Sequence, residues 1–286
     1  MLRLPPRLGR LWWRLRHLPG DLLAPPADRR VPPRGLAWVG AGDFVAVGDA
    51  MLAEFVGAGL APGDRVLDAG CGLGRMARPL AGYLDGGSYT GFDVVAADVA
   101  WCRRRYAARH PGFRFEHLDV ANAAYNPRGK VAADRLELPF PDGAFDFAIA
   151  ISLFTHLLPA AARRYLDEIA RTLAPGGRLY ATFFVLDEAA RAAVAAGTTE
   201  LGFAHELAGA RVQSRRRPEA AIAFERPELE RWLAAAGLEL ASFSAGSWRG
   251  RGAAPVYQDV VVARRPGAPA TAAPASAGGA GDGGLG

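Results

Sequence analysis

The chain carries the stretch Arg65-Val66-Leu67-Asp68-Ala69-Gly70-Cys71-Gly72-Leu73-Gly74-Arg75, and this stretch decides the fold. Val66 and Leu67 are typical of the end of a buried strand, and three glycines at alternate positions then predict a tight turn. A helix is expected from about Arg75. Glycine lets the backbone adopt positive φ and approach a ligand closely, and a helix N-terminus presents unpaired N–H groups. Because ligands of open α/β sheets bind beyond the carboxyl ends of the strands, a ligand site is predicted at this turn.

Asp68 stands just ahead of the glycines, which follow the pattern GxGxG and not the GxGxxG dinucleotide fingerprint. A carboxylate at this point would repel a pyrophosphate and would suit a ligand that brings an ammonium group. The stretch resembles motif I of the class I S-adenosylmethionine-dependent methyltransferases. This resemblance implies an S-adenosylmethionine site that includes Asp68, Gly70, Cys71, Gly72 and Gly74. The alternative is a plain strand-turn-helix whose glycines serve packing alone.

A second carboxylate follows near the end of the next predicted strand, Ser88–Val94. Asp93 comes 25 residues after Asp68. In nucleotide-binding folds a carboxylate at this place accepts hydrogen bonds from the two vicinal hydroxyls of a ribose. We therefore expect Asp93 to bind the ribose of the cofactor. The alternatives are a helix N-cap and a solvated turn residue.

Three further cofactor contacts are implied by the resemblance. The third predicted strand, Phe113–Leu118, runs into Asp119, and an acidic residue at this place in the family often accepts from the adenine amino group. The backbone N–H of Val120 would then face the adenine ring. The fourth predicted strand, Phe145–Ile151, is followed by Ser152, which we also assign to the cofactor site.

His156 is the best candidate for a general base. The sulfonium methyl group of S-adenosylmethionine is already electrophilic, so the protein has mainly to orient the acceptor, exclude water and remove a proton. His156 lies just past the fourth strand, on the expected substrate side, and histidine titrates near neutrality. The alternative is a histidine that caps the following helix or packs beside the cofactor. The sequence shows no metal site, serine triad or pair of catalytic carboxylates.

The C-terminal part of the chain decides the last two strands. Strands are predicted at 238–244 and 257–263, and the segment 245–256 between them is too short for a crossover helix, which predicts an antiparallel hairpin. With five preceding strand–helix units, the expected fold is an α/β, Rossmann-like, seven-stranded mixed sheet with helices on both faces. Its implied order, 3-2-1-4-5-7-6 with strand 7 antiparallel, is that of the methyltransferase family, which residues 38–264 resemble.

Three segments are expected along the chain. Residues 1–37 form a basic arm and proline-rich linker, 38–264 the methyltransferase domain, and 265–286 a disordered tail. Within the domain, 187–226 holds two short helical patterns and is expected to cap the substrate side. Residues 1–23 could form a short basic amphipathic helix that makes weak contact with an anionic membrane surface. The alternatives are a helix packed on the body and a frayed arm.

The composition of the 286-residue chain argues against several classes of protein. The net charge of +5 is concentrated in residues 1–35, so the remainder is near neutral and nucleic-acid binding is not expected. The two cysteines, Cys71 and Cys102, form no zinc pattern, and no apolar run approaches the ~18 residues of a membrane-spanning helix. A cytoplasmic location is therefore expected.

The sequence thus predicts S-adenosylmethionine-dependent methyl transfer to a small-molecule acceptor, through an oxygen or nitrogen nucleophile. The alternative is a non-catalytic S-adenosylmethionine-binding or membrane-associated scaffold that keeps the fold. The acidic residue before the glycine turn, together with Asp93, favours the enzyme, because a scaffold does not need both. A polyamine synthase of the same fold would want several acidic residues after the fourth strand, and Ser152–His156 supply none.

Overall fold

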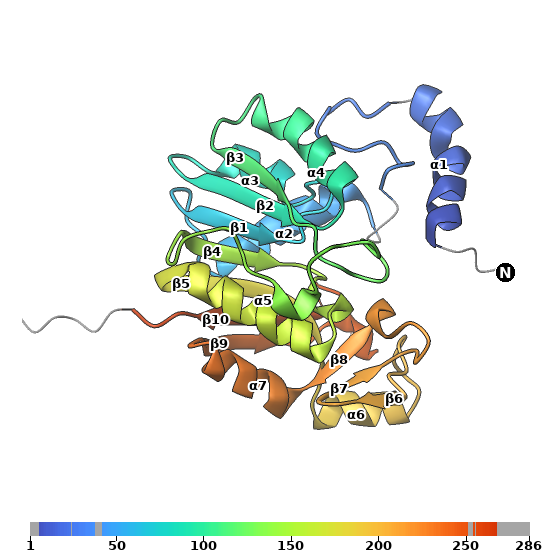
Figure 1. Ribbon diagram of the computed structural model, residues 1–286, viewed down its shortest axis with the longest axis vertical. Coiled ribbons are helices and arrows are strands. Elements are labelled where there is room, and N and C mark those ends of the chain that lie inside the picture. The colour runs from blue at the N-terminus through green and yellow to red at the C-terminus, as the bar shows by residue number, and fades with distance from the viewer. Residues whose placement is uncertain (1–5, 24, 38–41, 251–253, 255, 268–286) are drawn as a thin grey trace, which may run out of the picture.

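The computed structural model describes residues 6–23, 25–37, 42–250, 254 and 256–267. These residues form a ten-stranded sheet between two layers of helices (Figure 1). Residues 38–41 and the tail from residue 268 lie outside the described residues.

The central part of the sheet has the predicted strand order. Five parallel strands lie in the order β3-β2-β1-β4-β5, and β10 and β9 follow as an antiparallel hairpin beside β5. These strands are β1 (Arg65–Ala69), β2 (Ser88–Asp93), β3 (Phe113–His117), β4 (Phe145–Ala150), β5 (Leu173–Leu186), β9 (Glu239–Ser244) and β10 (Asp259–Arg264). The expected order 3-2-1-4-5-7-6 is confirmed, with β9 and β10 as the sixth and seventh strands of that scheme.

Helices cover both faces of the sheet, as predicted. One face carries α2 (Phe44–Gly57), α3 (Ala77–Tyr83) and α4 (Ala96–Cys102), the last continued by a π-helical turn over Arg103–Ala107. The other face carries α5 (Pro159–Thr172) and α7 (Arg226–Ala235). Asp43 is the N-cap of α2, where its carboxylate accepts from the backbone N–H groups of Val45 and Ala46 at 2.9 and 2.8 Å.

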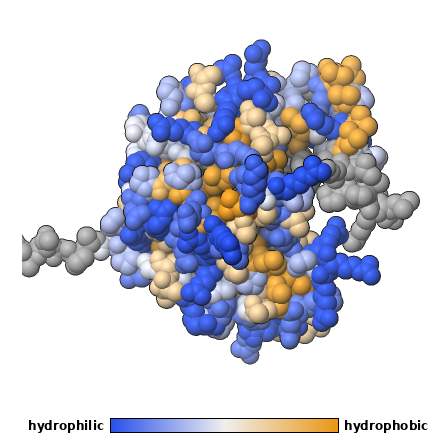
Figure 2. Space-filling view, in the orientation of Figure 1, coloured by the Kyte–Doolittle hydropathy of each residue, from blue (hydrophilic) through white to orange (hydrophobic). Residues whose placement is uncertain are grey.

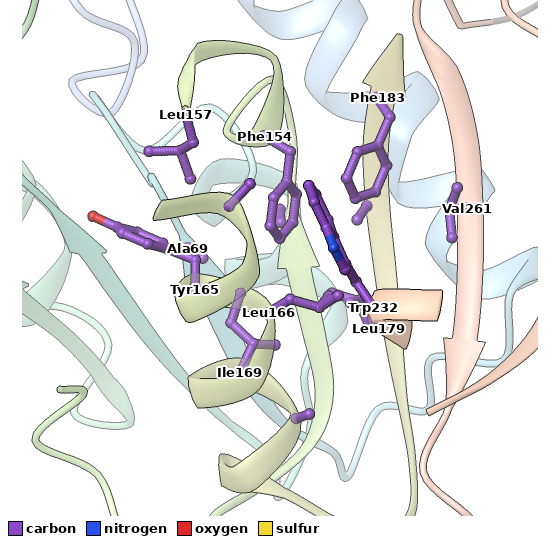
Figure 3. Packing of buried hydrophobic residues seen from close by; sticks show 14 of the residues in the cluster. Ala69, Phe154, Leu157, Tyr165, Leu166, Ile169, Leu179, Phe183, Trp232 and Val261 are labelled. Carbon is purple, nitrogen blue, oxygen red and sulfur yellow. The ribbon is translucent and has the colours of Figure 1, made fainter. Parts of the chain in front are cut away.

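The packing of α5 shows how the sheet is held on one face. Leu166 and Ile169 lie on one side of the helix and are buried (Figure 3). Phe154 stacks on Phe183 of β5 with ring centroids 4.5 Å apart, and Trp232 of α7 joins the same cluster. Burying a side chain of this size contributes about 1.5–3 kcal/mol, so this cluster fixes the chain just after β4.

The segment 187–226 differs from its prediction. Two short helical patterns were expected, and the structure has α6 (Glu188–Ala195) and a 3₁₀ turn at Pro218–Ala220. It also has three strands that the sequence did not predict, which are β6 (His205–Leu207), β7 (Ala210–Val212) and β8 (Ile222–Glu225). β8 pairs with the last residues of β5, while the earlier part of β5 pairs with β10. These strands are three or four residues long, too short to give a readable period of two.

A buried ion cluster joins this segment to the hairpin. Arg249 is 6% exposed and Asp259 is fully buried. The guanidinium donates to Asp259 at 2.7 Å and to both oxygens of Asp187 at 2.8 Å, and Asp259 also accepts from the backbone N–H of Val185. Because a buried charge without a partner is costly, this cluster ties the start of α6 to β10.

The N-terminal helix α1 (Pro6–Leu23) is attached to the linker that follows it. The indole of Trp13 donates to the carbonyl of Arg34 at 2.9 Å, and the carboxylate of Asp21 accepts from the backbone N–H groups of Arg34 and Gly35, each at 2.8 Å. In the part of the chain that the structure describes, no helix is long and apolar enough to cross a membrane.

Candidate functional site

Two adjoining chambers lie at the carboxyl end of the parallel strands, where the sequence predicts the ligand site. The Asp93 chamber, of about 160 Å³, is bordered by Asp93 at the end of β2 and by the residues after β4. The Asp68 chamber, of about 150 Å³, lies between the end of β1, the start of α2 and the linker. The two chambers share Gly70, Gly72, Asp98, Ile151 and Ser152. A single elongated ligand can therefore occupy both.

The first two glycines of the turn border the cavity. Gly70 and Gly72 have φ of +81° and +50°, and a Cβ on Gly72 would meet no atom within 4 Å. The N–H groups of Gly70 and Cys71 both donate to the carbonyl of Phe92 at 2.9 and 3.0 Å, which fixes the turn against the end of β2. The side chain of Cys71 is buried and also borders the Asp68 chamber.

The third glycine of the turn serves packing. Gly74 has φ +79° and borders neither chamber. A Cβ at this position would lie 2.8 Å from the ring of Tyr106, whose hydroxyl donates to the carbonyl of Gly74 at 2.9 Å. For this residue the packing alternative has direct structural support, whereas its predicted contact with the cofactor stays a prediction.

Asp68 is a buried carboxylate that accepts a hydrogen bond from a neighbouring side chain. It is 2% exposed, and one of its oxygens accepts from the hydroxyl of Tyr89 at 2.6 Å. Burial raises the pKa of Asp68 to about 7, the Tyr89 hydroxyl opposes this shift, and the nearby Asp93 adds to it. A cationic ligand group in the chamber would therefore stabilise the ionised form of this residue.

Asp93 is held by the backbone on both of its oxygens. One oxygen accepts from the N–H of Gly72 and the other from the N–H of Val95, each at 2.8 Å. Burial raises the pKa of Asp93, and these backbone hydrogen bonds work in the opposite direction. The carboxylate borders its chamber while it braces the glycine turn. The N-cap of α4 is Val95 and not Asp93, so the N-cap alternative is wrong, and the ribose assignment stays a prediction.

Asp119 and Val120 border neither chamber. The carboxylate of Asp119 accepts from the side-chain amide of Asn126 at 3.0 Å, and Val120 is 2% exposed and bridges to Val131. The next residue, Ala121, does border the Asp93 chamber. The assignment of Asp119 and Val120 to adenine stays a prediction, without a cavity beside them to support it.

Ser152 lies where the two chambers meet, as predicted for a cofactor residue. Its φ of +56° is unusual for a residue with a side chain. Its N–H donates to the hydroxyl oxygen of Thr182 at 2.8 Å, and its own hydroxyl donates to the side-chain carbonyl of Gln258 at 3.1 Å. Such strained backbone is often found at functional sites, where the surrounding structure holds it.

His156 borders the Asp93 chamber and is held in one orientation. Its Nδ1 lies 2.9 Å from the carbonyl oxygen of Glu219, in the 3₁₀ turn of the segment 187–226. The side-chain carboxylate of Glu219 accepts from the backbone N–H of Ala123 at 2.7 Å, and the ring of Tyr125 meets the imidazole edge-on at 5.6 Å. Burial lowers the pKa of His156, although its hydrogen bond to Glu219 works in the opposite direction.

Several residues that border the chambers were not predicted from the sequence. They include Asp98, Asn122, Tyr125, Tyr165 and Arg75. Asp98 lies in the first turn of α4, five residues after Asp93, and this spacing was a usable signal. Arg75 gave no signal of its own, because the chain holds 34 basic residues of which all but one are arginine.

Residues 67–181 match a family model described as a methyltransferase domain. The O-methyltransferase cnsE of Penicillium expansum is 35% identical over 143 residues, which is 49% of this chain and 46% of that protein. A fatty-acid O-methyltransferase of Mycolicibacterium smegmatis is 35% identical over 115 residues, 40% of this chain and 35% of that protein. This chain therefore matches less than half the length of either curated relative.

Solved structures agree on the fold. A methyltransferase of Methanosarcina mazei, described as S-adenosylmethionine-dependent, has a TM-score of 0.51 at 23% identity and covers 74% of this chain and 97% of its own. The [4+2]-cyclase SpnF has a TM-score of 0.53 at 21% identity, with 92% and 97% covered. At these identities the likeness shows the fold alone. The family model and the curated relatives support a class I S-adenosylmethionine-dependent methyltransferase domain over the residues that they match.

Proposed function

We propose that this chain transfers a methyl group from S-adenosylmethionine to an oxygen or nitrogen nucleophile of a small molecule. One observation carries the proposal: the carboxylates of Asp68 and Asp93 border adjoining chambers on either side of the glycine turn. S-adenosylmethionine has an ammonium group at one end and a ribose diol in its middle. The two chambers therefore suit two parts of one ligand.

The residues of the Asp68 chamber fit the methionine part of the cofactor. The buried carboxylate of Asp68 has a raised pKa and accepts a hydrogen bond from Tyr89, and a ligand ammonium group would stabilise its ionised form. Arg75 borders the same chamber, and a guanidinium suits the carboxylate at that end of the ligand. The open space beside Gly72 leaves room for close approach to the backbone.

His156 is the proposed general base. A carbonyl oxygen only accepts, so Nδ1 carries the proton in the contact with Glu219 and the neutral ring keeps Nε2 as an acceptor. The lowered pKa keeps the ring neutral at pH 7, ready to take the proton of an acceptor hydroxyl or protonated amine at Nε2. His156→Ala is expected to lower kcat by about 10²–10⁴-fold and to leave cofactor affinity unchanged.

The acceptor is proposed to be a small molecule with an apolar body. Leu153, Leu157 and Phe92 line the Asp93 chamber beside His156, and the relatives named above include O-methyltransferases, one of them for fatty acids. The segment 187–226 is proposed to cap this side, because Glu219 contacts both His156 and Ala123. We place the protein in the cytoplasm, with residues 1–23 in contact with a membrane surface.

A second function, from another class, is a protein that keeps the cofactor site and transfers no methyl group. The observation that favours it is the fold neighbour SpnF, which is described as a [4+2]-cyclase. Calorimetric titration with S-adenosylmethionine, followed by incubation of the methyl-labelled cofactor with a cell extract, separates the two. Binding with transfer of label to a small molecule supports the methyltransferase. Binding without transfer supports the second function, and absence of binding contradicts both.

A further inference from the structure

The N-terminal helix α1 presents large apolar side chains to solvent. Four leucines at helical spacing form one stripe, and each is between 48 and 72% exposed. They are Leu11, Leu15, Leu18 and Leu22. Figure 2 shows an apolar patch at the place that α1 occupies in Figure 1. A contiguous exposed apolar surface is typical of an interaction site, whereas single exposed apolar residues are normal on any protein.

The stripe is not the side of α1 that packs on the protein. Trp13, His17 and Asp21, four residues apart, are the half-buried residues of the helix between residues 11 and 23. Trp13 and Asp21 make the hydrogen bonds to the linker at Arg34 and Gly35. At 100° per residue the leucine stripe points away from this attached side, so it stays free when the helix is docked.

Arginines flank the stripe. The side chains of Arg14 and Arg16 are exposed, and Arg16 lies over the ring of Trp12 with its Cζ 5.2 Å from the ring centroid. Trp12 is itself 48% exposed beside the stripe. A helix with a leucine face, an interfacial tryptophan and basic margins has the amphipathic pattern of helices that lie in the plane of a lipid surface. Residues 1–35 hold eight arginines and two aspartates, which adds attraction to anionic lipid.

We infer that α1 docks on an anionic lipid bilayer, with the leucine stripe among the acyl chains at the interface and Arg14 and Arg16 at the headgroups. A second copy of this chain fits the stripe less well. Two such helices packed face to face would bring their arginines together, and one stripe of four leucines is far below the ~800 Å² per partner of a stable dimer. This inference stands independently of methyl transfer.

Sedimentation of the full chain with vesicles tests the inference. Vesicles of phosphatidylcholine with phosphatidylglycerol are expected to bind the protein at least tenfold more tightly than phosphatidylcholine alone, and added salt should reduce the difference. Leu15→Glu, in the centre of the stripe, is expected to weaken binding to the anionic vesicles about tenfold or more. The double variant Arg14→Gln, Arg16→Gln is expected to weaken it about 25-fold, at about fivefold per arginine.

The control is Leu240→Glu, which changes an exposed leucine of β9 and is expected to bind vesicles like the unchanged protein. Circular dichroism and thermal unfolding check that α1 persists in each variant. Equal binding by the unchanged protein, Leu15→Glu and the arginine variant, with helix content preserved, overturns the inference. So does a dimer in sedimentation velocity that Leu15→Glu dissociates while vesicle binding is absent.

Discussion

The ends of β1 and β2 each carry a carboxylate, the first buried and the second half-buried, and the two are held in different ways. Asp68, at the end of β1, accepts from one side-chain hydroxyl, that of Tyr89. Asp93, at the end of β2, accepts from two backbone N–H groups, those of Gly72 and Val95. Asp93 therefore helps to hold the glycine turn in place. Asp68 makes no such hydrogen bond to the turn among the described residues and borders the cavity. A substitution at Asp93 should weaken both the fold and cofactor binding, whereas a substitution at Asp68 should weaken binding without weakening the fold.

The largest effect is expected for Asp93→Ala. It removes the acceptor of two backbone donors beside the chamber and the proposed partner of the ribose diol, so cofactor affinity should fall at least 100-fold. The free energy of unfolding should fall by about 2–3 kcal/mol, because the turn loses its brace. Calorimetry and chemical denaturation measure the two quantities, with Asp85→Ala at an exposed loop carboxylate as the control. Unchanged affinity would remove the ribose assignment.

Asp68→Asn should separate binding from stability. Loss of the negative charge is expected to weaken cofactor binding about 50-fold, because the ammonium group loses its partner. The free energy of unfolding at pH 8 should rise by about 2 kcal/mol, since the native state no longer carries a buried carboxylate whose pKa is raised to about 7. The same calorimetric and denaturation measurements apply. If Asp68→Asn lowered the free energy of unfolding as much as Asp93→Ala, the proposal that only Asp93 stabilises the fold would be wrong.

The pH dependence of cofactor affinity should follow Asp68. Its pKa is about 7 in the free protein, so the carboxylate is protonated below this pH and must lose the proton to pair with an ammonium group. Affinity should therefore be about tenfold weaker at pH 6 than at pH 8, and binding near pH 7 should release a proton to the buffer. Titrations in buffers of different ionisation enthalpy detect this release. Asp68→Asn should abolish most of the dependence, and a flat profile in the unchanged protein would contradict the assignment.

Arg75→Gln should have the smallest effect of the four. The guanidinium borders the Asp68 chamber, and burial lowers its pKa while Asp43 opposes the shift. Removing its charge is expected to weaken binding of S-adenosylmethionine about fivefold, and binding of a cofactor analogue that lacks the carboxylate should not change. Arg104→Gln, at an exposed site in the π-helical turn that continues α4, is the matched control. Equal losses for both ligands would place Arg75 outside the methionine site.

The sequence predicted the elements that a local sequence pattern marks clearly. The glycine turn, the apolar β4 and the short link before β10 each allowed one reading, and the strand order is confirmed. The strands β6, β7 and β8 could not be predicted, because their places depend on pairing: β8 pairs with the last residues of β5, β7 with β8, and β6 with β7. Their apolar residues are buried by neighbours distant in sequence.

The candidate site divides along a similar line. Asp68, Gly70, Gly72, Asp93, Ser152 and His156 all border the chambers, because strand ends and the turns after them have fixed places in this fold. Asp119 and Val120 follow a strand too, but the loop after them folds back on itself through the bridge between Val120 and Val131. Glu219, which holds His156 in place, is 63 residues away along the chain, and no local sequence pattern predicts their contact.

The hydrogen bonds of Asp21 give α1 a role inside the molecule as well as at its surface. Asp21 fixes the backbone at Arg34 and Gly35, and the next two residues, Leu36 and Ala37, form one wall of the Asp68 chamber. A helix at the surface and the buried carboxylate of Asp68 are thus linked by a short series of covalent and hydrogen bonds. A chain that lacks residues 1–23 would keep every residue that lines the chambers. It would lose the hydrogen bonds from Asp21 that hold the segment before Leu36 and Ala37.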